Sequence, residues 1–247
     1  MSGKTASNRP DLSEFGQIEI LRPLKGSTRS CVYLVTDGKK QLVAKSTAEP
    51  EASLEWLQEA KRHAEAVGFI TPRSYRTRGG ALAQDGWTLE SFEFGTPYPT
   101  SSLPDLASSM REFRAATSNM PQRPGCLASC DYLYQDKGPD IDFSSLPDEI
   151  AAAARAAWEN FCTNPLEVIH GDLGAGNILM TGSGRAVLID WDEARRDIAL
   201  FDEFPLLPFD RTTKNEQRAY YAWEAASGWD KEPEYARRMA DLLLALS

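Results

Sequence analysis

The sequence is poor in histidine and cysteine, the two residues that build most protein zinc sites. It has two histidines and four cysteines, which are His63, His170, Cys31, Cys126, Cys130 and Cys162. Their spacing matches neither a zinc pattern nor a disulfide framework. We therefore expect four reduced thiols, as in a cytoplasmic protein. A redox-active pair formed by Cys126 and Cys130 is the alternative.

Long apolar runs and excess positive charge are also lacking. No run of about eighteen apolar residues occurs, so no membrane span is expected, and the polar start MSGKTASNRP has no signal-peptide core. Lys and Arg number 27 against 36 Asp and Glu, which gives a formal net charge of -9. This balance disfavours a nucleic-acid binder. An acidic surface attracts cationic ligands, although it also simply keeps a protein soluble.

What is present suits a globular protein of 247 residues, with 42% hydrophobic and 26% charged residues, in one large domain or two small lobes. Short β-branched segments predict strands at residues 16–24, 30–37 and 39–46, with a hairpin turn at Asp37-Gly38. Period-two alternation in the third strand places Leu42 and Ala44 on one face and Lys45 on the other.

The remaining pattern changes from strand to helix along the chain. Residues 50–67 predict a helix with an apolar stripe of Leu54, Leu57 and Ala64. Strands are predicted near residues 72–76 and 86–94, followed by a turn at Gly95-Thr96-Pro97. Later helices are predicted at 105–118, at 148–161, and as a pair after Asn215 that breaks near Gly228. Residues 119–147 lack a clear pattern, which is typical of functional or mobile segments.

The most informative stretch is VIHGDLGAGNILMTGSGRAVLIDWDEA, residues 168–194. It is not a P-loop, because Asn177 stands where that motif needs lysine, and it lacks the third glycine of a dinucleotide-binding loop. Asp172, Asn177 and Asp190 instead form an oxygen-donor set that suits a hard cation such as magnesium. The turn TGSG at 181–184 predicts a hairpin that brings Asn177 close to Asp190.

The segment His170-Gly171-Asp172, followed by Asn177 and then by Ile189-Asp190-Trp191-Asp192, resembles the aminoglycoside phosphotransferase and choline kinase superfamily. These are small-molecule kinases with the protein-kinase fold. The resemblance implies an α+β, bilobal fold with a nucleotide-binding lobe at residues 1–94 and a catalytic and substrate-binding lobe at 95–247. It also implies ATP and Mg²⁺ as cofactors, Asp172 as catalytic base, and Asn177 and Asp190 as magnesium ligands.

Further upstream, the resemblance implies that Lys45 contacts the α- and β-phosphates and pairs with a glutamate on the next helix. Glu59 is the preferred partner, while Glu51 and Glu55 remain open. The loop containing Gly26, Ser27 and Thr28 would lie over the phosphates. Ser91 and Glu93 would bind adenine through their backbone, although a strand end followed by a turn explains the same residues.

Four residues in or near the motif are expected to be structural or are left open. His170 is expected to hold the loop in shape, and Asp202 to brace it from the next helix. Asp192 either contacts a second metal or stays solvated. Trp191 is expected to pack beneath the metal ligand.

The predicted function is transfer of the ATP γ-phosphate to a hydroxyl of a small molecule, which the acidic charge allows to be cationic. An aminoglycoside-like antibiotic, an amino sugar and a related metabolite all fit, so a role in antibiotic resistance is one of several. The expected partners are this acceptor alone, with no nucleic acid or membrane, and the protein would be a monomer or homodimer. Residues 119–147 are expected to contribute to the acceptor pocket or its lid.

Two alternatives are a non-catalytic nucleotide-binding module and a protein kinase. The first is disfavoured because Lys45, Asp172, Asn177 and Asp190 are all present. The second is disfavoured because no activation segment or Ala-Pro-Glu signature follows Asp190.

Overall fold

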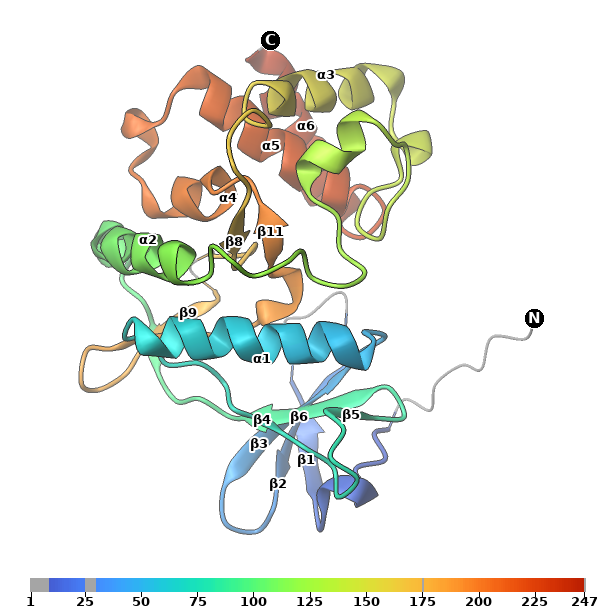
Figure 1. Cartoon of the computed structure of the whole chain (residues 1–247), viewed down its shortest axis with the longest axis vertical. Coiled ribbons are helices and arrows are strands. Elements are labelled where there is room, and N and C mark those ends of the chain that lie inside the picture. Colours follow the sequence, from blue (N-terminus) through green and yellow to red (C-terminus); the bar gives the residue numbers. More distant parts are fainter. Residues whose placement is uncertain (1–8, 25–29, 175, 247) are drawn as a thin grey trace. The chain divides into compact units, whose positions relative to one another are not determined.

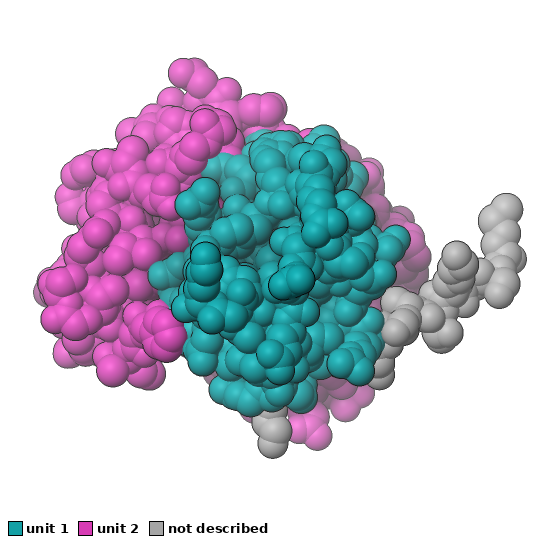
Figure 2. Space-filling view, turned by 90° about the horizontal axis from the view of Figure 1, so that it is seen from below, with its two compact units in different colours: residues 1–58, 72–93 teal, residues 59–71, 94–247 magenta. Residues whose placement is uncertain are grey.

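The computed structural model of the chain describes residues 9–24, 30–174 and 176–246. The chain divides into two compact units, one made of Met1–Gln58 and Pro72–Glu93 and the other of Glu59–Thr71 and Phe94–Ser247 (Figure 2). The first unit is built mainly on an antiparallel sheet and the second mainly on helices (Figure 1). This composition agrees with the predicted α+β class. The contiguous lobes 1–94 and 95–247 stay a prediction.

The sheet of the first unit is antiparallel in every pairing among the described residues. Its order is β1-β2-β3-β6-β4, with β5 paired to β6. The strands are β1 (Glu19–Pro23), β2 (Val32–Thr36), β3 (Gln41–Ser46), β4 (Ser74–Tyr75), β5 (Ala83–Gln84) and β6 (Trp87–Ser91). The predicted alternation in β3 is confirmed, because Leu42 and Ala44 are fully buried beside Val35, Trp87 and Leu89.

The hairpin between β2 and β3 is held by Asp37, whose carboxylate accepts hydrogen bonds from the backbone N–H groups of Lys39 and Lys40 at 2.9 Å each. Helix α1 (Glu51–Ala66) follows. Its residues up to Gln58 belong to the first unit, and those from Glu59 onward belong to the second. Leu54, Leu57 and Ala64 are buried as their spacing predicts. The chain leaves the helix at Gly68, which has a φ of +103° that glycine adopts without steric cost.

The second unit contains two small antiparallel sheets. One has the order β10-β9-β7 and the other pairs β11 with β8. Their strands are β7 (Thr96–Pro97), β8 (Glu167–Ile169), β9 (Ile178–Met180), β10 (Ala186–Leu188) and β11 (Arg195–Asp197). The turn expected at Gly95-Thr96-Pro97 is wrong, since Thr96 and Pro97 pair with Met180 and Leu179. The proline fits there because β7 is an edge strand, where a missing N–H group is tolerated.

The longer helices of the second unit lie close to their predicted positions. They are α2 (Ala107–Ala116), α3 (Asp148–Glu159), α4 (Leu200–Glu203), α5 (Lys214–Gly228) and α6 (Pro233–Ala245). Short 3-10 turns are η1 (Ser13–Phe15), η2 (Thr100–Leu106), η3 (Ser129–Leu133), η4 (Phe143–Ser145), η5 (Trp191–Glu193), η6 (Phe204–Leu206) and η7 (Phe209–Arg211). The break predicted near Gly228 is confirmed by the end of α5. No described helix is long and apolar enough to cross a membrane.

The core of this unit is aromatic. The indole of Trp158 on α3 lies 6.2 Å from the ring of Trp223 on α5 and donates a hydrogen bond to the Ala219 carbonyl at 3.1 Å. Phe143 and Phe201 pack against the same pair. Helices α3 and α5 are thereby fixed to one another.

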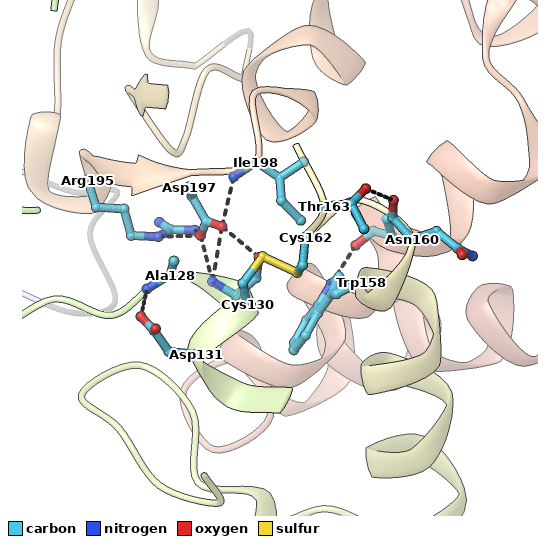
Figure 3. Close-up of a disulfide and its surroundings, with 12 residues drawn as sticks. Ala128, Cys130, Asp131, Trp158, Asn160, Cys162, Thr163, Arg195, Asp197 and Ile198 are labelled. Carbon is cyan, nitrogen blue, oxygen red and sulfur yellow. Dashed lines mark hydrogen bonds and ion pairs between the residues drawn. A yellow bond between two sulfur atoms is a disulfide. The ribbon is translucent and has the colours of Figure 1, made fainter. Parts of the chain in front are cut away.

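Two of the four cysteines form a disulfide, which corrects the expectation of four reduced thiols. Cys130 in η3 is bonded to Cys162, three residues beyond the end of α3 (Figure 3). The two Cα atoms are 5.5 Å apart, although 32 positions separate the residues in sequence. Sequence spacing did not reveal the pair because η3 and α3 meet only in the folded unit. Cys31 and Cys126 are not part of a disulfide.

Candidate active site

The hairpin of β9 and β10 places Asn177 and Asp190 at the same end of two paired strands. Leu188 pairs with Ile178, and the backbone N–H of Ile189 donates to the Asn177 carbonyl at 3.0 Å. Asp190 follows directly, so the predicted proximity of the two residues is confirmed. Asp190 has a φ of 62° and a ψ of 65°, a left-handed conformation that is uncommon outside glycine. Such conformations cluster where function constrains the backbone.

Asp172 joins this group through Asn177. The side-chain amide of Asn177 donates to Asp172 Oδ2 at 2.7 Å and to the Asp172 carbonyl at 3.0 Å. Because both bonds use Nδ2, the amide oxygen Oδ1 is directed away from Asp172. The Asp172 side chain itself is exposed. The three residues therefore lie close together along the backbone, and the oxygens of two carboxylates and one amide are ligands that a hard divalent cation prefers.

The backbone directly before Asp172 is held in place by Asp202 on α4. Asp202 is fully buried and accepts hydrogen bonds from the backbone N–H groups of His170 at 2.7 Å and Gly171 at 2.9 Å. Burial raises the pKa of Asp202 to about 6, and the two backbone donors oppose that rise. The predicted bracing role of Asp202 is confirmed.

Gly171 is required for the close approach of two loops. Its φ is +85°, and a Cβ atom at this position would lie 2.4 Å from the Glu193 carbonyl oxygen. His170, which directly precedes Gly171, is also held in place. His170 Nε2 lies 3.0 Å from the Ile189 carbonyl, and the buried Trp191 ring packs against the imidazole at a centroid distance of 4.8 Å. His170 thus serves as scaffold, as expected, and Trp191 is buried against it. The expected position of Trp191 beneath the metal ligand stays a prediction.

The first part of segment 119–147 holds the chain beyond Asp190 in place. Arg123 is buried and donates from Nη1 to the carbonyls of Asp192 at 2.6 Å and Ala194 at 3.0 Å. Asp197 on β11 accepts bonds from the backbone N–H and the hydroxyl of Ser129 at 3.0 and 2.6 Å. The Asp197 carboxylate also pairs with Arg195 at 2.8 Å (Figure 3). Sequence analysis missed the contacts of Arg123, because a single arginine in an irregular segment belongs to no recognisable sequence pattern.

The second part of the segment lines a polar cavity of about 140 Å³. Residues 137–142 form one wall, and Ala226, Ser227, Asp230 and Lys231 form the other. Lys137 pairs with Asp142 at 2.5 Å, and Lys231 lies 3.8 Å from Asp140. A role for this segment in acceptor binding stays a prediction.

In the first unit, Lys45 lies on β3 with Thr88 of β6 and Val32 of β2 as its neighbours in register. Three helix glutamates are candidates for its partner, and each has contacts of its own. Glu51 accepts from the Leu82 N–H at 2.8 Å, Glu55 pairs with Arg76 at 2.6 Å, and Glu59 pairs with Arg62 and with His63. The pairing of Lys45 with Glu59 stays a prediction.

Ser91 and Glu93, the predicted adenine-binding residues, lie at the end of β6. Ser91 donates its backbone N–H to the Arg73 carbonyl at 2.8 Å, and its hydroxyl donates to the Glu93 carboxylate. Glu93 is the last residue of the first unit. The phosphate-loop residues Gly26, Ser27 and Thr28 lie outside the described residues.

An aromatic and acidic cluster on α5 and α6 was not singled out by sequence analysis. Tyr235 on α6 donates its hydroxyl to Glu224 Oε2 on α5 at 2.9 Å. One turn earlier on α5, the ring of Tyr220 stacks on Phe204 at a centroid distance of 4.2 Å. Burial raises the pKa of Tyr220, and the charges of Glu224, Tyr235 and Asp172 raise it further. The only sequence signal is the four-residue spacing of Tyr220 and Glu224, which places them on one helix face.

Comparison with known proteins identifies the class to which this site belongs. The sequence matches the model of the phosphotransferase enzyme family over residues 20–240, so the chain belongs to that family. It is therefore a phosphotransferase enzyme, and the family resemblance seen in the sequence is confirmed. No match to a curated protein was found.

Solved structures share the fold at low sequence identity. A microcompartment-associated aminopropanol kinase is 13% identical, with 91% of this chain and 89% of that chain covered at a TM-score of 0.61. A thermostable mutant of the aminoglycoside phosphotransferase APH(4)-Ia, in a ternary complex with AMP-PNP and hygromycin B, is 14% identical, with 95% of each chain covered and a TM-score of 0.65. The choline kinase LicA from Streptococcus pneumoniae is 13% identical over 93% of this chain and 94% of that chain, with a TM-score of 0.60. The kinase-like α+β fold is thereby confirmed.

Proposed function

We propose that this enzyme transfers the γ-phosphate of ATP to a hydroxyl group of a small molecule, with Mg²⁺ as cofactor. Family membership supports phosphotransfer, and the similar structures include an ATP-analogue complex of an aminoglycoside phosphotransferase. The observation that supports the proposal most strongly is the grouping of Asp172, Asn177 and Asp190 through the amide bond at 2.7 Å and the hairpin pairing at 3.0 Å.

Asp172 is the proposed catalytic base. Its exposed carboxylate orients the acceptor hydroxyl and takes its proton as the hydroxyl oxygen bonds to the γ-phosphorus. The bond from that phosphorus to the β–γ bridging oxygen breaks, and ADP leaves. The brace from Asp202 to Gly171 keeps Asp172 in position, because its two hydrogen bonds fix the backbone immediately before it.

The oxygens of Asn177 and Asp190 are the proposed ligands of Mg²⁺, and the donor set fits this ion. When bound, Mg²⁺ neutralises negative charge on the phosphate groups. In the first unit, Lys45 and the loop of Gly26, Ser27 and Thr28 are proposed to bind phosphates. The backbone of Ser91 and Glu93 is proposed to bind adenine, and Glu59 to anchor Lys45.

The experiment that tests the proposal measures ADP release from ATP with and without Mg²⁺, across a panel of small alcohols, together with phosphate transfer to the acceptor. We expect Asp190→Ala to abolish turnover, because it removes a carboxylate that would hold Mg²⁺. Asp210→Ala, which changes an exposed carboxylate in η7, is the matched control and should retain activity. Wild-type turnover in Asp190→Ala would overturn the proposal.

A further inference from the structure

Another cavity of the second unit lies between α2, α4 and the turn that follows α4. It has a volume of about 190 Å³ and is lined by Ala107, Met110, Arg111, Arg114, Glu203, Leu206 and Leu207. The first four of these residues lie on α2, and Glu203 is the last residue of α4. Neither Asp172 nor Asn177 nor Asp190 belongs to the lining. The cavity is therefore built from other residues than the proposed catalytic site.

Arg114 has an unused hydrogen-bond donor at this cavity. The residue is only 5% exposed, its Nε lies 2.6 Å from Glu167 Oε2, and its Nη2 lies 2.5 Å from Glu203 Oε1. Its Nη1 is buried and has no hydrogen-bond partner within the described part of the chain. Nη1 is attached to the same carbon as Nη2, which contacts the cavity-lining Glu203. Because a buried donor without an acceptor is costly, an oxygen supplied by an occupant of the cavity is favoured.

The cavity offers more positive than negative charge to an occupant. Arg111 precedes Arg114 by three residues, so both side chains lie on one face of α2. Arg111 is exposed, whereas the lining carboxylate of Glu203 is already paired with Arg114. Two guanidinium groups that face one cavity favour a carboxylate, which accepts hydrogen bonds from both.

The rest of the wall is apolar and sets the size of the occupant. Ala107, Met110, Leu206 and Leu207 supply this part of the lining. A cavity of about 150 Å³ holds one benzene ring, so 190 Å³ has room for a ring with one small polar group. Leu207 is 36% exposed, so the cavity is reached from solvent on this side. Met110, one turn before Arg114, is unbranched and adapts readily, which lets an oxygen reach the buried Nη1.

We propose that this cavity binds a small apolar carboxylate, with its charged group on Arg111 and Arg114 and its apolar body against Leu206 and Leu207. The site is distinct from the one proposed for ATP and the acceptor, and the inference does not depend on the proposed function. Glu203 directly follows Asp202, which braces the backbone before Asp172. The occupant therefore contacts the short helix that carries this brace.

The test titrates the full-length protein calorimetrically with benzoate and 4-methylpentanoate, which combine a carboxylate with a compact apolar body. Benzamide has the shape of benzoate without its charge, and acetate has the charge without the ring. We expect one bound benzoate per chain, with an affinity at least about tenfold higher than that of benzamide, because charge-assisted hydrogen bonds are stronger than neutral ones. Acetate should bind at least about tenfold more weakly, since it leaves the apolar wall unfilled.

Variants assign the binding to this cavity. Arg111→Gln should weaken benzoate binding by about tenfold, and Leu207→Trp should abolish it by filling the entrance. Both residues are exposed, so the protein should still fold. Arg114→Lys keeps a positive charge but removes the second donor arm, and it should weaken binding if the variant folds. Arg237→Gln, an exposed arginine on α6, is the matched control and should bind benzoate as the wild type does.

A titration repeated at saturating ATP and Mg²⁺ separates this cavity from the nucleotide site. The benzoate affinity should not change, whereas displacement by ATP would place the carboxylate elsewhere and overturn the inference. It would also be overturned if neither carboxylate binds, if benzamide binds as tightly as benzoate, or if Arg111→Gln and Leu207→Trp leave the affinity unaltered. None of these measurements depends on turnover, so their failure leaves the proposed phosphotransfer untouched.

Discussion

Asn177 donates its side-chain N–H to the carboxylate of Asp172, with Nδ2 and Oδ2 2.7 Å apart, so the proposed metal ligand also positions the proposed base. We expect Asn177→Ala to lower kcat by about 10- to 100-fold, since one well-placed hydrogen bond to a charged group is worth about 1.5 to 3 kcal/mol. It should also raise the Mg²⁺ concentration needed for half-maximal rate. A magnesium titration of steady-state turnover measures both effects, and an unchanged requirement would contradict the ligand role.

The raised pKa of Asp202 leads us to predict that the free energy of unfolding depends on pH. Its pKa is raised from the ordinary value of 3.8 to about 6 because burial disfavours the carboxylate. The folded state therefore binds this proton more tightly than the unfolded state. The contribution of Asp202 to stability is fully present below about pH 4 and is lost as the pH rises through 6.

The size of this effect is about 3 kcal/mol from the difference between the two pKa values. It is measured as the difference in unfolding free energy between wild type and Asp202→Asn, by urea denaturation from pH 4 to 8. That difference should fall between pH 4 and 6 and then level off, because asparagine does not titrate. A difference that is constant with pH would contradict the raised pKa.

The Cys130–Cys162 bond predicts that two of the four cysteines resist alkylation until the protein is reduced. Closing a loop of 32 residues restricts the unfolded chain, so its loss should cost about 3 to 4 kcal/mol on a chain-entropy estimate. We expect Cys130→Ser to lower the unfolding free energy by this amount under oxidising conditions. Cys126→Ser is the control, because Cys126 is not part of a disulfide. Four alkylated thiols in the unreduced protein would contradict the disulfide.

Sequence reasoning succeeded where a feature is local. The hairpin that brings Asn177 close to Asp190 is formed by one continuous stretch of sequence that contains its own turn. The alternation of buried and partly exposed residues around Lys45 is visible within six residues. The predicted pairing of Lys45 with Glu59 stays a prediction, because Glu51 and Glu55 fit the same helix equally well from the sequence.

Features formed by distant parts of the chain were missed. The disulfide partners are 32 positions apart, and Arg123 reaches a carbonyl 69 residues away. Thr96 and Pro97 were expected to form a turn because proline is common in turns. The sequence does not show that these residues pair with β9 at the edge of a sheet. The contact of Tyr235 with Glu224 crosses two helices whose packing depends on Gly228 and Ala236, which no local pattern identifies.

The central claim is that Asp172 accepts the proton of the acceptor hydroxyl. Asp172→Asn keeps the shape of the side chain and an oxygen that can still accept from Asn177, but it replaces the charged acceptor with a neutral amide. General-base assistance is typically worth about 10²- to 10⁴-fold in rate. Asp210→Asn, an exposed aspartate in η7, is the matched control.

The decisive measurement is therefore kcat for Asp172→Asn beside calorimetric affinities for ATP and acceptor on the same preparation. The account predicts that kcat falls by about 10²- to 10⁴-fold while both affinities stay near those of the wild type. A fall in kcat of less than about tenfold, equivalent to about 1.4 kcal/mol, would contradict the role of Asp172 as base. A collapse of either affinity would assign Asp172 to binding instead.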